Sequence, residues 1–160
     1  MANPVKHQRP KNAKAPFQIL NVDNTNEPAR INIYDIIGET WWDDGITGKN
    51  FVNELATLGK TRDLNVHISS FGGDVVDGTV IYNALLQHQG TINIIIEGWA
   101  CSIASVIAMA GDTVKISEIS MMMIHKPLNW CGGNANDMRK NADMLDKVEG
   151  ALSKAYTQKT

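Results

Sequence analysis

Ser102 lies where a predicted strand gives way to a predicted helix, and a hydroxyl group at such a junction can act as a nucleophile. Residues 91–97 form an isoleucine-rich run that favours a buried strand, and Ile103–Ala110 is typical of a helix ending at Gly111. The first turn of a helix offers unpaired backbone N–H groups and the positive end of the helix dipole, which would stabilise an oxyanion. The alternative is that the small residues of this segment only let a buried helix pack closely.

A glycine pair, Gly72 and Gly73, follows a strand predicted at 64–69 from its alternating pattern. Asp74 and Asp77 have the spacing of a helix cap, so a helix is expected directly after the turn. Two successive strand–turn–helix units bring both turns to one edge of a largely parallel sheet, where ligands of open α/β sheets bind. The turn would expose backbone N–H groups at that edge, although such a pair alone indicates only a tight bend.

His125 follows a short strand predicted at 121–124. An imidazole at the end of a strand can serve as the general base for a serine nucleophile, and a structural role is the alternative. Taken with the serine at a helix start and the glycine turn, it points towards nucleophilic catalysis.

The remaining elements are expected from hydrophobic periodicity. Strands are predicted at 17–22, 31–37 and 113–117, and a helix capped by Thr47 is predicted to end at Gly59. The core-facing residues expected in this helix are Phe51, Val52, Leu55 and Leu58, and those in the helix after Asp74 are Val76, Val80, Ile81, Ala84 and Leu85. A long final helix from about Ala135 carries an apolar stripe of Met138, Ala142, Leu145, Val148, Leu152 and Ala155.

Composition limits the function classes. The 160 residues are 43% hydrophobic with a formal net charge of −2, which predicts one globular domain at 17–160 after a flexible basic arm at 1–16. Neither nucleic-acid binding nor membrane insertion is indicated, and the absence of a secretory signal predicts a cytoplasmic protein. Cys101 and Cys131 lack metal-type spacing and are expected to be free thiols, and neither a metal nor a cofactor is expected.

Over residues 31–160 the chain resembles the ClpP serine peptidases, and among them the phage and prophage head-maturation proteases. Three segments carry the resemblance: Ser70-Phe-Gly-Gly-Asp74, Gly98-Trp-Ala-Cys-Ser102-Ile and Met123-Ile-His125-Lys-Pro127. The resemblance implies an α/β fold of the ClpP/crotonase type, with repeated β-β-α units and a long protruding handle helix.

The resemblance also implies roles for single residues. Ser102 would be the nucleophile, His125 the general base, and the backbone N–H groups of Gly73 and Ile103 the oxyanion hole. The implied activity is hydrolysis of peptide bonds through an acyl-enzyme, in head maturation or protein turnover. The substrate groove would be lined by Phe71, Gly72, Pro127 and Leu128.

The family's third triad residue, an aspartate beyond the long helix, has no counterpart before Thr160. The chain is therefore expected to be a C-terminally truncated member with impaired activity, because the acid orients and stabilises the histidine. The expected partners are a peptide or protein substrate, further copies joined through the handle helix, and capsid or scaffold proteins or an unfoldase. Three alternatives stay open: an inactive assembly or scaffold protein, a crotonase-type acyl-CoA enzyme, and a Ser–Lys peptidase using Lys126.

Overall fold

The computed structural model describes residues 17–20, 27–40 and 45–159, which divide into two compact units between Met123 and Ile124. The basic arm predicted at 1–16 lies outside the described residues, as do the last two residues of the strand predicted at 17–22. Among the described residues, no helix is long and apolar enough to cross a membrane.

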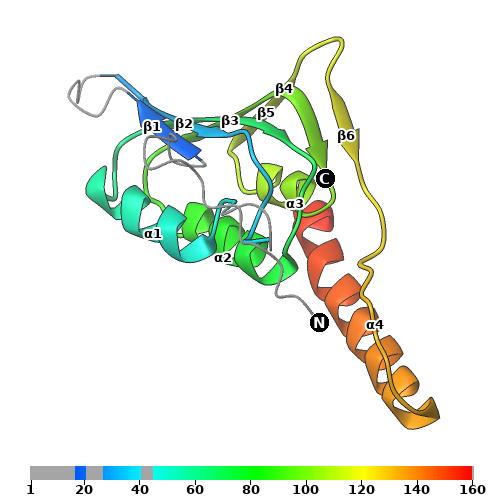
Figure 1. Ribbon diagram of the computed structural model, residues 1–160. Coiled ribbons are helices and arrows are strands. Elements are labelled where there is room, and N and C mark those ends of the chain that lie inside the picture. Colours follow the sequence, from blue (N-terminus) through cyan, green and yellow to red (C-terminus); the bar gives the residue numbers. More distant parts are fainter. Residues whose placement is uncertain (1–16, 21–26, 41–44, 160) are drawn as a thin grey trace, which may run out of the picture. The chain divides into compact units, whose positions relative to one another are not determined.

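The first unit is a six-stranded sheet in the order β1-β2-β3-β4-β5, with β6 paired to β4. All pairs are parallel except β1 with β2, so the predicted α/β architecture with a largely parallel sheet is confirmed. Helices α1 and α2 lie on the same side of this sheet (Figure 1). The elements are β1 (Phe17–Leu20), β2 (Ala29–Ile33), α1 (Gly48–Thr57), β3 (Leu64–Ser70), α2 (Val75–Leu86), β4 (Ile92–Cys101), α3 (Ile103–Ala108), β5 (Thr113–Ile116) and β6 (Met121–Met123).

Alternation along the strands sorts their side chains between a helix-covered face and an open face. Leu64, Val66 and Ile68 of β3 are completely buried, while the residues between them are partly exposed. Burying each such aliphatic side chain contributes about 1.5–3 kcal/mol, so the register of β3 is strongly determined. The same alternation in β4 buries Ile94 and Ile96.

The strand predicted at 31–37 is wrong in its second half, because β2 ends at Ile33. The Asp35 carboxylate accepts a hydrogen bond from the Ile36 N–H at 2.8 Å, and this local bond competes with strand pairing. Ile37 returns to extended pairing only as single bridges to Ile46 and Gly73.

The turn expected after residue 97 is also wrong, since β4 continues to Cys101 through its pairing with β6. Between the pairs Ile68–Ile96 and Ser70–Ala100, β3 advances by two residues and β4 by four. β4 therefore carries a bulge immediately before Ser102, and a bulge re-aims the strand that contains it.

The predicted helices are present, but their buried faces are narrower than expected. Thr47 caps α1 by accepting a hydrogen bond from the Asn50 N–H at 3.2 Å, and Asp74 caps α2 in the same way, as predicted. Val52, Val76 and Val80, predicted to face the core, are exposed. The buried residues of α2 are instead Gly78, Ile81 and Leu85, which lie on one face at helical spacing.

The second unit consists of an irregular segment followed by α4 (Ala135–Thr157). The long final helix predicted from about 135 is confirmed, and Asn134 and Asp137 form a reciprocal capping box at its start. The segment before the helix lies antiparallel to it. Lys126 pairs with Glu149 at 3.0 Å, and Asn129 bonds Asn141 at 3.3 Å.

Gly78 provides a test of the packing between α2 and α3. A Cβ atom added there would overlap the side chain of Ile103, whereas one added at Gly150 in α4 meets nothing within 4 Å. We expect Gly78→Ala to lower the free energy of unfolding by about 1–3 kcal/mol through overpacking. Gly150→Ala should raise it by up to about 1 kcal/mol through helix propensity. Urea denaturation measures both, and equal effects of the two substitutions would contradict this account.

Candidate functional site

Ser102 connects β4 to α3 in an unusual backbone conformation, with φ 54° and ψ −129°. It is the one non-glycine residue among those described that has a positive φ. Such a conformation costs on the order of 1–3 kcal/mol for a residue with a side chain, and residues of this kind occur often at active sites. A serine at a sharp strand-to-helix turn is also the geometry of a nucleophile elbow, which presents its hydroxyl group to the substrate.

Hydrogen bonds fix the backbone on both sides of Ser102. Its N–H donates to the carbonyl of Met123 at 2.8 Å, continuing the pairing between β4 and β6. Its carbonyl accepts from the buried Ser105 hydroxyl at 2.5 Å and from the Ser105 N–H at 3.0 Å. Strand pairing and the first helical turn together hold the strained conformation in place.

The glycine turn packs directly against this junction. A Cβ atom on Gly72 would stand 2.6 Å from the Cys101 carbonyl oxygen, 2.8 Å from the Ser102 Cβ and 3.2 Å from the Ile103 nitrogen. Gly72 also has a φ of 91°, so both space and conformation require glycine. The structure thus brings the two predicted glycine and serine segments together at one edge of the sheet.

Ser70, to which the sequence analysis gave no role, holds the glycine turn. Its hydroxyl donates to the Asp35 carbonyl at 2.6 Å and accepts from the Gly72 N–H at 3.1 Å. Ser70 is almost completely buried. Its position as the first residue of the turn was the available signal, since serine hydroxyls often bond the backbone two residues further on.

The Gly73 amide faces away from its neighbouring segment. Ile37 donates to the Gly72 carbonyl at 2.9 Å, and Asp74 donates to the Ile37 carbonyl at 2.8 Å. These two bonds make a parallel bridge between Ile37 and Gly73, in which the groups flanking Gly73 face Ile37 and the Gly73 N–H points to the opposite side. The Ile103 N–H is the first of α3, where intrahelical partners are lacking. Both are donors of the kind that stabilise a developing oxyanion.

Cys101, next to Ser102, is the other nucleophilic side chain of this segment. It is 1% exposed, and burial raises the pKa of its thiol. The burial also keeps a substrate away from this thiol, whereas Ser102 is partly exposed, so the environment favours Ser102 for nucleophilic chemistry. Both cysteines are free, as predicted, and the described residues contain no cluster of three or more His, Cys, Asp or Glu side chains that could hold a metal ion.

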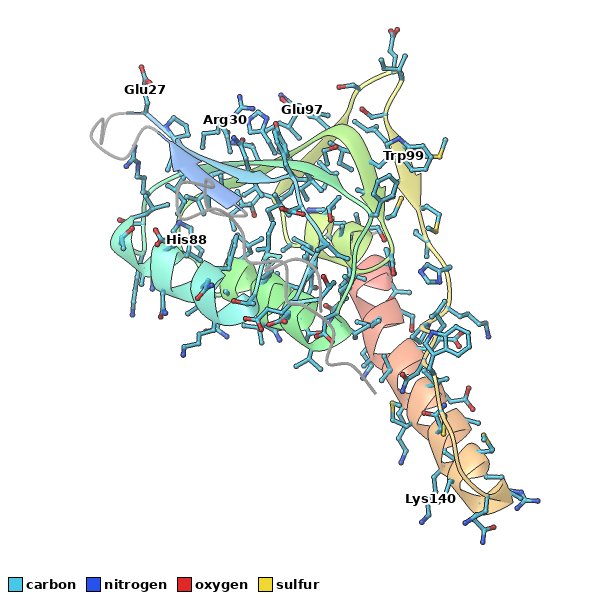
Figure 2. All side chains as sticks on the ribbon, in the orientation of Figure 1. Glu27, Arg30, His88, Glu97, Trp99 and Lys140 are labelled. Atoms are coloured by element: carbon cyan, nitrogen blue, oxygen red, sulfur yellow. The ribbon has the colours of Figure 1, made fainter. Side chains whose placement is uncertain are left out.

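A polar network crosses the open face of the sheet just before the bulge in β4. Glu97 accepts hydrogen bonds from Tyr34 and pairs with His67 at 2.7 Å and with Arg30 at 3.5 Å. The Tyr34 hydrogen bond and then His67 lower the pKa of Glu97, while burial and Glu97 raise the pKa of Tyr34. Figure 2 shows Arg30 and Glu97 on the side of the sheet opposite α1 and α2. The network ties three adjacent strands together where β4 changes register.

The predicted site residues divide between the two units. Phe71, Gly72, Gly73, Ser102 and Ile103 all belong to the first unit, where Gly72 lies against Ser102 and close to the Ile103 nitrogen. The predicted residues of the second unit are His125, Pro127 and Leu128, of which His125 and Leu128 are exposed and Pro127 is partly buried.

Comparison with known proteins gives a consistent match. A family model described as Clp protease matches residues 22–160. The ATP-dependent Clp protease proteolytic subunit 1 of Prochlorococcus marinus (strain NATL2A) is 32% identical over 101 residues, which is 62% of this chain and 52% of that protein. The ATP-dependent Clp protease proteolytic subunit of Pleurastrum terricola is 29% identical over 108 residues, covering 66% and 55%. The chain thus spans about half the length of these curated relatives.

The strain at Ser102 can be measured by comparing two substitutions that both remove the hydroxyl group. Ser102→Gly relieves the positive φ, whereas Ser102→Ala keeps a Cβ in the same strained conformation. We expect the glycine variant to be more stable than the alanine variant by about 1 kcal/mol, after the larger unfolded-state entropy of glycine is subtracted. Paired urea titrations measure the difference. An alanine variant as stable as the glycine variant would show that the backbone there is relaxed.

Proposed function

The chain belongs to the Clp protease family, and from this premise we propose that it carries the nucleophile of a serine endopeptidase. Its substrate is a peptide bond, and the reaction proceeds through an acyl-enzyme. The assignment of roles is Ser102 as nucleophile, His125 as general base, and the N–H groups of Gly73 and Ile103 as oxyanion hole.

One observation carries this proposal: the contact between the glycine turn and the strained junction at Ser102. Gly72 leaves no room for a side chain against Ser102 and lies close to the Ile103 nitrogen. A carbonyl group attacked by the Ser102 hydroxyl would therefore develop its negative charge among backbone donors that are already oriented. Preorganised donors of this kind are often the largest single contribution to catalysis, and removing one typically costs about 100- to 1,000-fold in kcat.

The chemical steps balance with the residues named. The Ser102 Oγ forms a bond to the scissile carbonyl carbon while its proton passes to His125, and the oxyanion is held by the two N–H groups. The carbon–nitrogen bond then breaks, and His125 returns the proton to the departing amine. Water attacks the resulting ester by the same route and releases the acid. No cofactor takes part in these steps.

The course of the chain supports His125 as the base. The carbonyl of Met123 accepts the Ser102 N–H at 2.8 Å, and His125 is the second residue after Met123. Two residues of extended chain span at most about 7 Å, so the chain length allows the imidazole to reach the Ser102 hydroxyl. Lys126, the base of the Ser–Lys alternative, is engaged with Glu149 at 3.0 Å.

The same proposal extends to the branch of the family, the cellular location and the partners. We assign the chain to the phage or prophage head-maturation branch, a ClpP/crotonase-type protein that acts in the cytoplasm on capsid or scaffold proteins or with an unfoldase. The names of the relatives describe proteolytic subunits of ATP-dependent proteases, which supports a partner that delivers substrate.

Helix α4 is proposed as the handle through which copies associate. Met138 and Met144 are exposed on this helix, and Leu145, Val148 and Leu152 are only partly buried. An apolar stripe that remains accessible on a long helix is typical of an interface.

Covalent labelling tests the nucleophile. An alkyl fluorophosphonate should modify Ser102 of the wild-type chain, and mass spectrometry of the digested protein locates the adduct. Ser102→Ala should abolish labelling, and His125→Ala should slow it by at least about 100-fold, because the general base is lost. Ser153→Ala is the matched control: it removes a serine hydroxyl at an exposed position of α4 outside the site and should leave labelling unchanged. An adduct on any other residue, or no adduct on a folded chain, would contradict the proposal.

Light scattering tests the association through α4. We expect the wild-type chain to be oligomeric, and Leu145→Asp combined with Leu152→Asp to give a smaller species that circular dichroism shows to be folded, because buried carboxylates disrupt apolar contacts. Ala151→Asp combined with Ser153→Asp adds the same charge at exposed positions and serves as the control. A monomeric wild-type chain at tens of micromolar would refute the assignment of α4 as an interface.

A further inference from the structure

Large apolar side chains gather at one end of the open face of the sheet. Phe71 is 74% exposed, Trp99 43% and Met121 49%, and the rings of Phe71 and Trp99 lie 5.7 Å apart with a tilt of 45°. Trp99 and Met121 are register partners of β4 and β6, so their side chains point to the same face. Single exposed apolar residues are common on proteins, whereas a contiguous cluster marks a binding surface. Phe71, Trp99 and Met121 are called the aromatic cluster here.

The middle of the open face carries polar side chains that bond one another. Arg30 bonds the Asn32 side chain at 2.8 Å, and Asn65 accepts a hydrogen bond from Asn93 at 3.2 Å, alongside the network around Glu97. In Figure 2, Arg30 and Glu97 lie over the middle of this face, and Trp99 lies further along, beside β6. The large exposed side chains of the aromatic cluster therefore lie at the end of the sheet that leads into Ser102, and an occupant need not cover the whole face.

The aromatic cluster shares its backbone with the nucleophile. Phe71 directly precedes Gly72, which contacts the Ser102 Cβ, and Trp99 is three residues before Ser102 in the same strand. Three residues of strand extend over about 10 Å, which is the distance between a scissile bond and a side chain two or three residues away in an extended peptide. A permanent protein partner on this surface would obstruct the approach to Ser102, whereas a substrate would engage both at once.

We infer that the aromatic cluster is a subsite that selects a large apolar side chain, aromatic or aliphatic, at the second or third residue from the scissile bond of the substrate. This inference rests on the proposed function, since it requires Ser102 to be the nucleophile. Phe71 and Trp99 supply two rings that contact each other and remain exposed, so a third apolar group can pack against the surface they share. Met121 completes the surface with a flexible side chain that adapts to substrates of different shape.

Peptidyl phosphonates of variable sequence test the subsite on the full chain. For each of three positions before the phosphorus, the rate of Ser102 modification is measured with phenylalanine or asparagine at that position. The wild-type chain should prefer phenylalanine at the second or third position by about tenfold or more, the discrimination that an apolar pocket provides. Trp99→Ala and Phe71→Ala should each bring this ratio close to one, because the rate with phenylalanine should fall by more than the rate with asparagine.

Two comparisons separate the possible outcomes. Ile119→Ala removes an apolar side chain that is 97% exposed and lies outside the aromatic cluster, so it should leave the ratio unchanged. A simple alkyl fluorophosphonate, which has no peptide side chains, reports on Ser102 alone. If that reagent labels Ser102, the proposed function stands. The subsite is then refuted if Trp99→Ala keeps the wild-type ratio of the phenylalanine rate to the asparagine rate, even where both rates fall. If the reagent fails to label folded wild-type chain, the proposed function fails and the subsite falls with it.

Discussion

The parallel pairing of β4 with β3 on one side and β6 on the other is the constraint on which the site depends. β3 holds β4 up to the bulge and again at Ala100, and β6 then holds it from Trp99 to Cys101. The hydrogen bond from the Ser102 N–H to Met123 continues this pairing by one residue. The chain must therefore turn sharply within one residue to begin α3, and the positive φ of Ser102 is the consequence.

The network around Glu97 complements that constraint from the open face. Glu97 is the first residue after the last regular pair of β4 with β3. Its carboxylate engages His67 of the adjacent β3 and Tyr34, which follows the end of β2 one strand further on. A bulge leaves backbone groups without ladder partners, so side-chain bonds to adjacent strands restrict the local freedom that results. Each bond is partly exposed and individually modest. Their value lies in linking three strands at the point where β4 leaves its regular register.

Much of the site followed from the sequence because its signals are local. The cap at Asp74, the glycine turn and the small-residue helix after Ser102 are read from neighbouring residues, and the structure has each of them. The extension of β4 to Cys101 could not be read, because it depends on pairing with Met121–Met123 twenty residues later. The exposure of Val76 and Val80 was missed for a related reason: α2 packs through Gly78, and a glycine carries no apolar signal.

Two explanations of the segment around Ser102 were open: close packing of small residues and a nucleophile at a helix start. Both require the same contacts. Gly72 lies against Ser102 because no Cβ intervenes, and Gly78 lets α2 approach Ile103. Ser105 is small enough to be completely buried while its hydroxyl reaches the Ser102 carbonyl. Those contacts hold the glycine turn against the start of α3 and leave no room there for a larger side chain. A larger residue at either glycine would push its segment away from this junction and loosen the core, so close packing and the proposed chemistry constrain the same positions.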